Sequence, residues 1–121
     1  MKDMYWSHLP HHVAGSEFQN AKPEDNNRIE TKSNRIYYYC EVSRGKNLTL
    51  NMKLKDLAGD LLDRSRSLQV DPGSIYLHIN SYGGSVFAGF SSVDYILNSA
   101  VPVTSIIDGC AASAATIMSV T

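Results

Sequence analysis

Ile75–Val86 reads IYLHINSYGGSV, and this stretch decides the fold class of the chain. Alternate residues of 75–79 are apolar, so one face of this segment is apolar and the segment predicts a strand. Gly83 and Gly84 then predict a sharp turn, because glycine adopts positive φ angles that other residues avoid. Apolar residues recur at helical spacing over 86–97, which predicts a helix after the turn.

The same alternation of strand and helix extends on both sides of this unit. The predicted elements are a strand at 36–42, a helix at 50–61, a break at 71–73, a strand at 102–107, a turn at 108–112 and a helix from 113. This order predicts an α/β fold of repeated β-α crossover units on a mainly parallel sheet. We expect the folded domain at 35–121.

Residues 1–34 are polar and aperiodic, unlike the rest of the chain. Such a composition buries little apolar surface against the entropy cost of ordering, so we expect a mobile arm. His8, His11 and His12 have a spacing that could bring three imidazoles together. Pro10 argues against the helical turn that such a metal site would need, so we expect solvated histidines and no metal.

The chain has 121 residues, of which 43% are hydrophobic and 19% charged, with a formal net charge of -1. This size suits one globular domain, and the balanced charge gives no electrostatic reason to expect nucleic acid or a membrane surface as partner. No apolar run approaches the ~20 residues of a membrane span, and Met1–Tyr5 does not begin a secretory signal. We expect a cytoplasmic protein whose cysteines, Cys40 and Cys110, are reduced.

Two turns stand out because each follows a predicted parallel strand and leads into a helix. Ligand and catalytic sites gather at such positions in open α/β sheets. The first turn, at 80–85, contains Gly83 and Gly84, whose N–H groups could point at a developing oxyanion. A tight connection without function is an equally open alternative. No lysine follows at the spacing of a phosphate-binding loop.

The second turn, at 111–115, reads AASAA and centres on Ser113. Small residues around a serine are typical of a nucleophile elbow, since neighbouring segments crowd a sharp strand-to-helix turn. Ser113 would then be the nucleophile and the Ala114 N–H an oxyanion donor. An ordinary serine N-cap in a small-residue seam is the alternative. Cys110, near the same turn, is a less favoured nucleophile.

Together the two turns resemble the proteolytic subunit of the Clp protease. The family pattern is an apolar strand, Asn-Ser-Pro-Gly-Gly, a helix, another strand and Gly-x-Ala-Ala-Ser. Residues 75–115 follow this pattern without a gap, and a weaker similarity reaches back to about Arg35. Signal-peptide peptidase A and phage head-maturation peptidases share the architecture.

Residue by residue, the resemblance implies a serine endopeptidase with Ser113 as nucleophile and the N–H groups of Gly84 and Ala114 as oxyanion hole. Gly83 and Gly84 would also align the substrate as an added β-strand. Tyr82 stands where the family has proline, and no cofactor is implied. We expect Gly84→Val to impair hydrolysis more than folding, because a branched side chain would crowd the substrate edge.

The family's catalytic histidine and aspartate follow the serine, whereas this sequence ends eight residues after Ser113. Neither the arm histidines nor His78, on the strand before the glycine turn, is expected to be the base. Asp94 is expected to face the helix exterior and is not proposed as the acid. We therefore expect a truncated chain that is inactive as given, with a His and then an Asp downstream if the natural gene continues.

The resemblance also implies peptide or unfolded protein substrates, a homo-oligomeric ring and an AAA+ unfoldase that docks on an apolar pocket. The matching positions are Tyr76, His78, Asn98 and Ile106. Two of the four are polar, so the unfoldase partner is in doubt. Two other interpretations stay open: a catalytically inactive ring subunit or scaffold, and a crotonase-like acyl-thioester enzyme. The Ala-Ala-Ser turn favours the peptidase, since crotonases need no serine there.

Overall fold

Four strands form one sheet in the order β1-β2-β3-β4 in a computed structural model, which describes residues 27–121. The strands are β1 (Arg28–Lys32), β2 (Arg35–Tyr39), β3 (Ile75–Ser81) and β4 (Val103–Ala111). β2, β3 and β4 run parallel, and β1 pairs antiparallel with β2. The predicted α/β fold on a mainly parallel sheet is confirmed.

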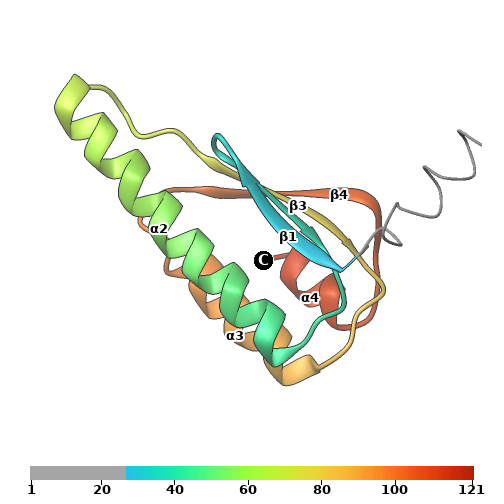
Figure 1. The fold of residues 1–121 in the computed structure, drawn as a ribbon. Helices are drawn as coiled ribbons and strands as arrows, with labels where there is room; N and C mark the ends of the chain where they lie inside the picture. The colour runs from blue at the N-terminus through green and yellow to red at the C-terminus, as the bar shows by residue number, and fades with distance from the viewer. Residues whose placement is uncertain (1–26) are drawn as a thin grey trace, which may run out of the picture.

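Within residues 27–121, three helices flank the strands, namely α2 (Arg44–Leu68), α3 (Val86–Leu97) and α4 (Ala114–Ser119). α2 and α3 lie side by side along one face of the sheet, and α4 follows the end of β4 (Figure 1). All three helices contribute buried side chains to one core with the strands. None of the helices in residues 27–121 is both long enough and apolar enough to cross a membrane.

Alternate residues of the two central strands face this core, as predicted for β3. Ile75, Leu77 and Ile79 of β3 are 0% exposed, and so are Ile36 and Tyr38 of β2. The residues between them face the opposite side of the sheet, which carries polar and aromatic side chains. The packed strands therefore hold the carboxyl ends of β3 and β4 in fixed positions.

α2 is longer than the leucine spacing predicted. It begins at Arg44 rather than near Leu50, because the Ser43 hydroxyl caps it by accepting from the Lys46 N–H at 3.3 Å. The helix ends at Leu68, shortly before the predicted break at 71–73. The added first turn contains polar residues, so it has no apolar periodicity that the sequence could reveal.

β4 continues to Ala111, four residues beyond the predicted end at 107. Its pairing with β3 shifts register between Ile79 and Ser81, where the β4 side of the ladder is longer. Irregular pairing of this kind re-aims a strand near its end. Here it brings the chain directly into the turn at Ser113.

The ordered part of the chain begins before the predicted boundary at Arg35. β1 pairs with β2 from Arg28 opposite Tyr39 to Lys32 opposite Arg35. Its sequence, RIETK, contains one apolar residue, so backbone pairing rather than hydrophobic patterning orders it. The folded domain therefore includes residues 28–34. Residues 1–26 of the predicted arm, which include His8, His11 and His12, lie outside the described residues.

Gly59 gives a direct stability prediction for α2. The residue is exposed, and an ideal Cβ built there meets no atom within 4 Å. Gly59→Ala is expected to raise the free energy of unfolding by about 0.5–1 kcal/mol, because alanine loses less backbone entropy in a helix than glycine. Chemical denaturation measures the change, and an unchanged or lower midpoint would contradict it.

Candidate functional site

The two predicted turns meet at the carboxyl ends of β3 and β4. The Ala112 N–H donates to the Ser81 carbonyl at 3.0 Å. An ideal Cβ at Gly83 would lie 2.6 Å from the Ser113 Cβ and 2.7 Å from the Ala112 carbonyl oxygen. Gly83 has a φ of 107°, so both its conformation and this close approach require glycine. The glycine turn and the serine turn are therefore in direct contact.

Ser113 has a backbone conformation that is unusual for a residue with a side chain. Its φ is 54° and its ψ is -125°. Strain of this kind at a serine between a strand and a helix is typical of a nucleophile elbow. The residue is exposed, and its hydroxyl caps no N–H group of α4. The alternative that Ser113 is an ordinary N-cap therefore does not explain its conformation. Cys110, the less favoured nucleophile, lies within β4 and not at the turn.

Two backbone N–H groups at the junction of the turns, those of Gly84 and Ala114, have no acceptor among the described residues. Val42 is hydrogen-bonded through its backbone to both neighbours of Gly84. Its N–H donates to the Gly83 carbonyl and its carbonyl accepts from the Ser85 N–H, each at 2.8 Å. In such a parallel bridge the amide of the central residue points to the opposite edge. The Gly84 N–H is thus available for a ligand.

Val42 also changes the expectation for substitutions of Gly84. An ideal Cβ at Gly84 would lie 2.2 Å from the Val42 carbonyl oxygen and 3.1 Å from the Glu41 Cγ. Gly84 has a φ of 144°, in a region that residues other than glycine avoid. A side chain would therefore disrupt the contact between the glycine turn and the segment after β2. The expected loss of hydrolysis in Gly84→Val stays a prediction, and the positive φ supports it. The crowding would fall on Val42 rather than on the substrate edge, so we expect folding to be affected as well.

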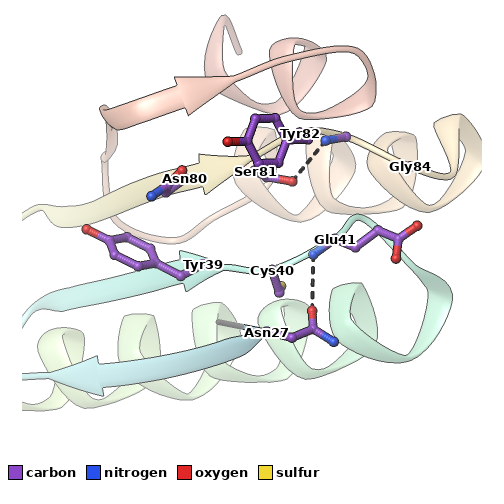
Figure 2. A pocket seen from close by; sticks show the side chains of 9 residues that line it. Asn27, Tyr39, Cys40, Glu41, Asn80, Ser81, Tyr82 and Gly84 are labelled. Atoms are coloured by element: carbon purple, nitrogen blue, oxygen red, sulfur yellow. Dashed lines mark hydrogen bonds between the residues drawn. The ribbon is translucent and has the colours of Figure 1, made fainter. Parts of the chain in front are cut away.

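A hollow of about 730 Å³ lies beside the glycine turn, between the carboxyl ends of β2 and β3. Figure 2 shows Asn80, Ser81 and Tyr82 on one side and Tyr39, Cys40 and Glu41 on the other. Ser81 is 3% exposed, and its hydroxyl accepts from the Gly83 N–H at 3.1 Å, which supports the turn. Burial raises the pKa of the Cys40 thiol, so this cysteine is not an activated nucleophile.

His78 is hydrogen-bonded through both ring nitrogens, on the face of the sheet away from α2 and α3. Arg35 Nη1 lies 2.8 Å from His78 Nε2, and Asp108 Oδ2 lies 2.8 Å from His78 Nδ1. Because arginine only donates, Nε2 accepts, and the Nδ1–H donates to Asp108. The ring also stacks on Tyr37 at 4.6 Å between centroids. These contacts leave His78 no free nitrogen for the serine.

The sequence did not predict this His78–Asp108 pair. Asp108 was assigned to a turn, whereas it belongs to β4, and parallel register sets Ile106 opposite His78. Of the positions matched to the unfoldase pocket, Tyr76 and His78 lie on β3 and Ile106 on β4, while Asn98 caps the end of α3. If β4 had been predicted to continue past 107, the pair could have been predicted as well. Side chains alternate along a strand, so Asp108 lies on the same face as Ile106, which is opposite His78.

Tyr39 also donates to Asp108, from its hydroxyl to Oδ2 at 2.6 Å. This hydrogen bond, with a smaller contribution from burial, raises the pKa of Tyr39 to about 12. A raised folded-state pKa gives stability that is complete below the ordinary pKa, 10.0, and is lost as the pH rises through 12. We expect Tyr39→Phe to reduce the fall in unfolding free energy between pH 10 and 12.

Denaturant titrations at each pH measure this fall. Tyr38 contributes in the same direction, because burial raises its pKa, so part of the fall remains in Tyr39→Phe. Tyr95→Phe is the control, since the Tyr95 hydroxyl has no hydrogen bond to the described residues. An equal pH dependence in wild type and Tyr39→Phe would mean that the Asp108 bond is absent in solution.

Two solved structures are similar to this chain in fold. A ClpP1 mutant from Listeria monocytogenes is 23% identical, with a TM-score of 0.60 over 71% of this chain and 44% of that one. The ClpP protease catalytic domain from Plasmodium falciparum is 24% identical, with a TM-score of 0.55 over 66% of this chain and 40% of that one. The matched region thus spans less than half the length of either structure.

Comparison with curated proteins gives no match. The family model of the Clp protease matches residues 32–121, which include β2, β3, β4 and both turns of the site. The match begins close to the predicted domain boundary and covers the motifs from which the resemblance was drawn. Because it extends over most of the sequence, this chain belongs to the Clp protease family.

Proposed function

We propose that this chain supplies the nucleophile and the oxyanion hole of a serine endopeptidase of the Clp class. The observation that carries the proposal is the strained backbone of Ser113 beside two uncommitted N–H groups, those of Gly84 and Ala114. A hydroxyl in this position can attack a peptide carbonyl while the carbonyl oxygen accepts from both amides. The amides would then stabilise the charge that develops on that oxygen.

The proposed substrate is a peptide or unfolded protein bound in extended form. The edge of Gly84 that faces away from Val42 offers main-chain groups for hydrogen bonds to such a peptide. Addition of a β-strand gives affinity through the main chain and leaves sequence preference to side-chain pockets. Gly83 and Gly84 are suited to this role because no side chain would hinder the approach.

The general base in this proposal is a histidine outside residues 27–121, oriented by an aspartate. A serine of ordinary pKa needs such a base to remove its proton. His78 does not fit the role, because Arg35 and Asp108 occupy both of its ring nitrogens. Peptidases of this family carry a His and then an Asp after the serine, and we expect the same order here if the natural gene continues past Thr121.

Assembly into a homo-oligomeric ring in the cytoplasm completes the proposal, on the strength of family membership alone. An AAA+ unfoldase partner has weaker support. His78, Arg35 and Asp108 form a hydrogen-bonded polar group on the sheet face where the family pocket is apolar. Inserting an apolar side chain there would desolvate these groups without new hydrogen bonds, which is unfavourable.

Two other functions would use the same fold differently. A crotonase-like acyl-thioester enzyme needs the backbone amides but no serine in a strained conformation, so the φ of Ser113 favours the peptidase. An inactive ring subunit would keep the turns and lack the base.

The test assays the complete natural protein with a fluorogenic peptide and, separately, with an acyl-CoA thioester. We expect hydrolysis of the peptide and no turnover of the thioester. Thioester turnover that survives Ser113→Ala would favour the crotonase alternative. An assembled ring without either activity would favour the inactive subunit.

A further inference from the structure

We propose that Asn47 is a positioning residue that sets the separation of the Gly84 and Ala114 amides. The inference deepens the proposed function and rests on it, because it concerns the geometry of the oxyanion hole. Asn47 is 0% exposed and lies in the first turn of α2, away from the surface where a substrate would bind. Its effect on the reaction would therefore pass through other residues.

The Asn47 side chain links three elements besides its own helix. Its Oδ1 accepts from the Tyr38 hydroxyl of β2. Its Nδ2 lies 3.0 Å from the Ala88 carbonyl of α3 and 3.6 Å from the Met118 sulfur of α4. It also donates to the Ser92 hydroxyl of α3 at 2.8 Å. One buried amide thus joins the sheet to both helices.

These two helices begin at the two halves of the site. α3 starts at Val86, directly after the glycine turn, and α4 starts at Ala114 itself. The helices also touch near their first turns, where an ideal Cβ at Gly89 would lie 3.3 Å from the Ala114 carbonyl oxygen. A shift of either helix relative to the other would therefore move the Gly84 amide relative to the Ala114 amide.

An amide holds this junction in a way that an apolar side chain does not. Hydrogen bonds have preferred distances and directions, and a buried donor without a partner costs free energy. The two N–H groups of Asn47 suit the Ala88 and Ser92 acceptors of α3, and its Oδ1 accepts from the Tyr38 hydroxyl. The longer contact of Nδ2 with the Met118 sulfur adds α4, so Asn47 fixes the relative positions of these elements. An apolar residue of similar size would fill the space without setting a direction.

Asn51 provides a matched control one helical turn later. It is also buried, at 4% exposure, and is also hydrogen-bonded to α3. Its Oδ1 accepts from the Ser92 hydroxyl at 2.8 Å, and its Nδ2 donates to the Ser91 hydroxyl at 3.3 Å. No hydrogen bond links Asn51 to α4 within the described residues. The two asparagines therefore differ in whether they reach the helix that follows the nucleophile.

The experiment compares Asn47→Ala with Asn51→Ala in the complete natural protein, at a temperature where both variants are fully folded. We expect Asn47→Ala to lower kcat by about 10²-fold with KM nearly unchanged, the effect of a misplacement of roughly 1 Å. Asn51→Ala is expected to change kcat no more than about threefold, because its hydrogen bonds among the described residues reach α3 and not α4. Equal losses of kcat in the two variants would overturn the proposal.

A second measurement does not depend on activity. Hydrogen–deuterium exchange should increase at 80–86 and at 111–118 in Asn47→Ala, whereas Asn51→Ala should increase exchange only in α2 and α3, where its own hydrogen bonds lie. If the wild type lacks peptidase activity, the proposed function fails while this measurement still tests the positioning role. Unchanged exchange at both turns in Asn47→Ala would refute that role.

If Asn47→Ala does not fold, the double variant Tyr38→Phe/Asn47→Leu takes its place. Replacing both partners of a buried hydrogen bond with apolar groups of similar shape can be nearly neutral for stability. A folded double variant with wild-type kcat would contradict the proposal. The expected result is a loss of kcat with an unfolding midpoint close to that of the wild type.

Discussion

Ser113→Ala is expected to lower peptide hydrolysis by the complete natural protein about 10⁶-fold in kcat, the loss typical of removing a serine nucleophile. The remaining rate would come from the oxyanion hole and substrate binding alone. Stability should change little, because the Ser113 side chain is exposed and makes no capping hydrogen bond. Kinetics with a fluorogenic peptide and a denaturation curve measure the two quantities.

Ser119→Ala is the matched control for this prediction. It makes the same chemical change in α4 and removes a hydrogen bond from the Ser119 hydroxyl to the Thr116 carbonyl at 2.8 Å. Ser119→Ala should change the free energy of unfolding by no more than about 0.5 kcal/mol, as surface substitutions generally do. It should leave the rate of peptide hydrolysis close to that of the wild type. A Ser113→Ala protein that keeps a tenth of the wild-type rate would exclude Ser113 as the nucleophile.

Gly84→Ala is expected to cost about 3 kcal/mol of unfolding free energy, a sum of backbone strain and steric overlap. The added methyl group would meet the Val42 carbonyl oxygen at 2.2 Å, and that atom belongs to the backbone. To relieve this steric overlap, the glycine turn must move away from Val42, and this movement also displaces the Gly84 amide. We therefore expect hydrolysis by the folded fraction to fall by about 10²–10³-fold, as when one oxyanion donor is lost.

Gly59→Ala separates this effect from the general consequence of replacing glycine. The substitution is identical, but the site is open and the expected change in stability has the opposite sign. Denaturation measures both variants, and the activity of each is compared at the same folded fraction. A Gly84→Ala protein as stable as the wild type would show that the bridge between Val42 and the glycine turn is not formed in solution.

Much of the fold follows from hydrophobic periodicity. Alternation over 75–79 predicted β3, and helical spacing predicted α3 with the bounds that the structure gives. Elements ordered by other forces were missed or shortened. β1 depends on backbone pairing, and the first turn of α2 depends on the Ser43 cap. Neither force leaves an apolar pattern in the sequence.

The site could be predicted in part. The motifs around Gly84 and Ser113 identified both turns, and the family resemblance implied that their amides form one oxyanion hole. The sequence could not reveal that Val42 packs against Gly84, because that contact joins segments 42 residues apart. It could not reveal the buried bonds of Asn47 either, since an asparagine near a helix start looks like a surface residue. Such contacts depend on the tertiary fold.

The most direct test of the central claim is the site of covalent labelling by a fluorophosphonate in the complete natural protein. The probe reacts with an activated serine, and peptide mapping by mass spectrometry identifies the residue that carries the adduct. We predict a single adduct on Ser113 that is lost in Ser113→Ala and retained in Ser119→Ala. An adduct on Cys110 or on another serine would contradict the assignment of Ser113 as the nucleophile.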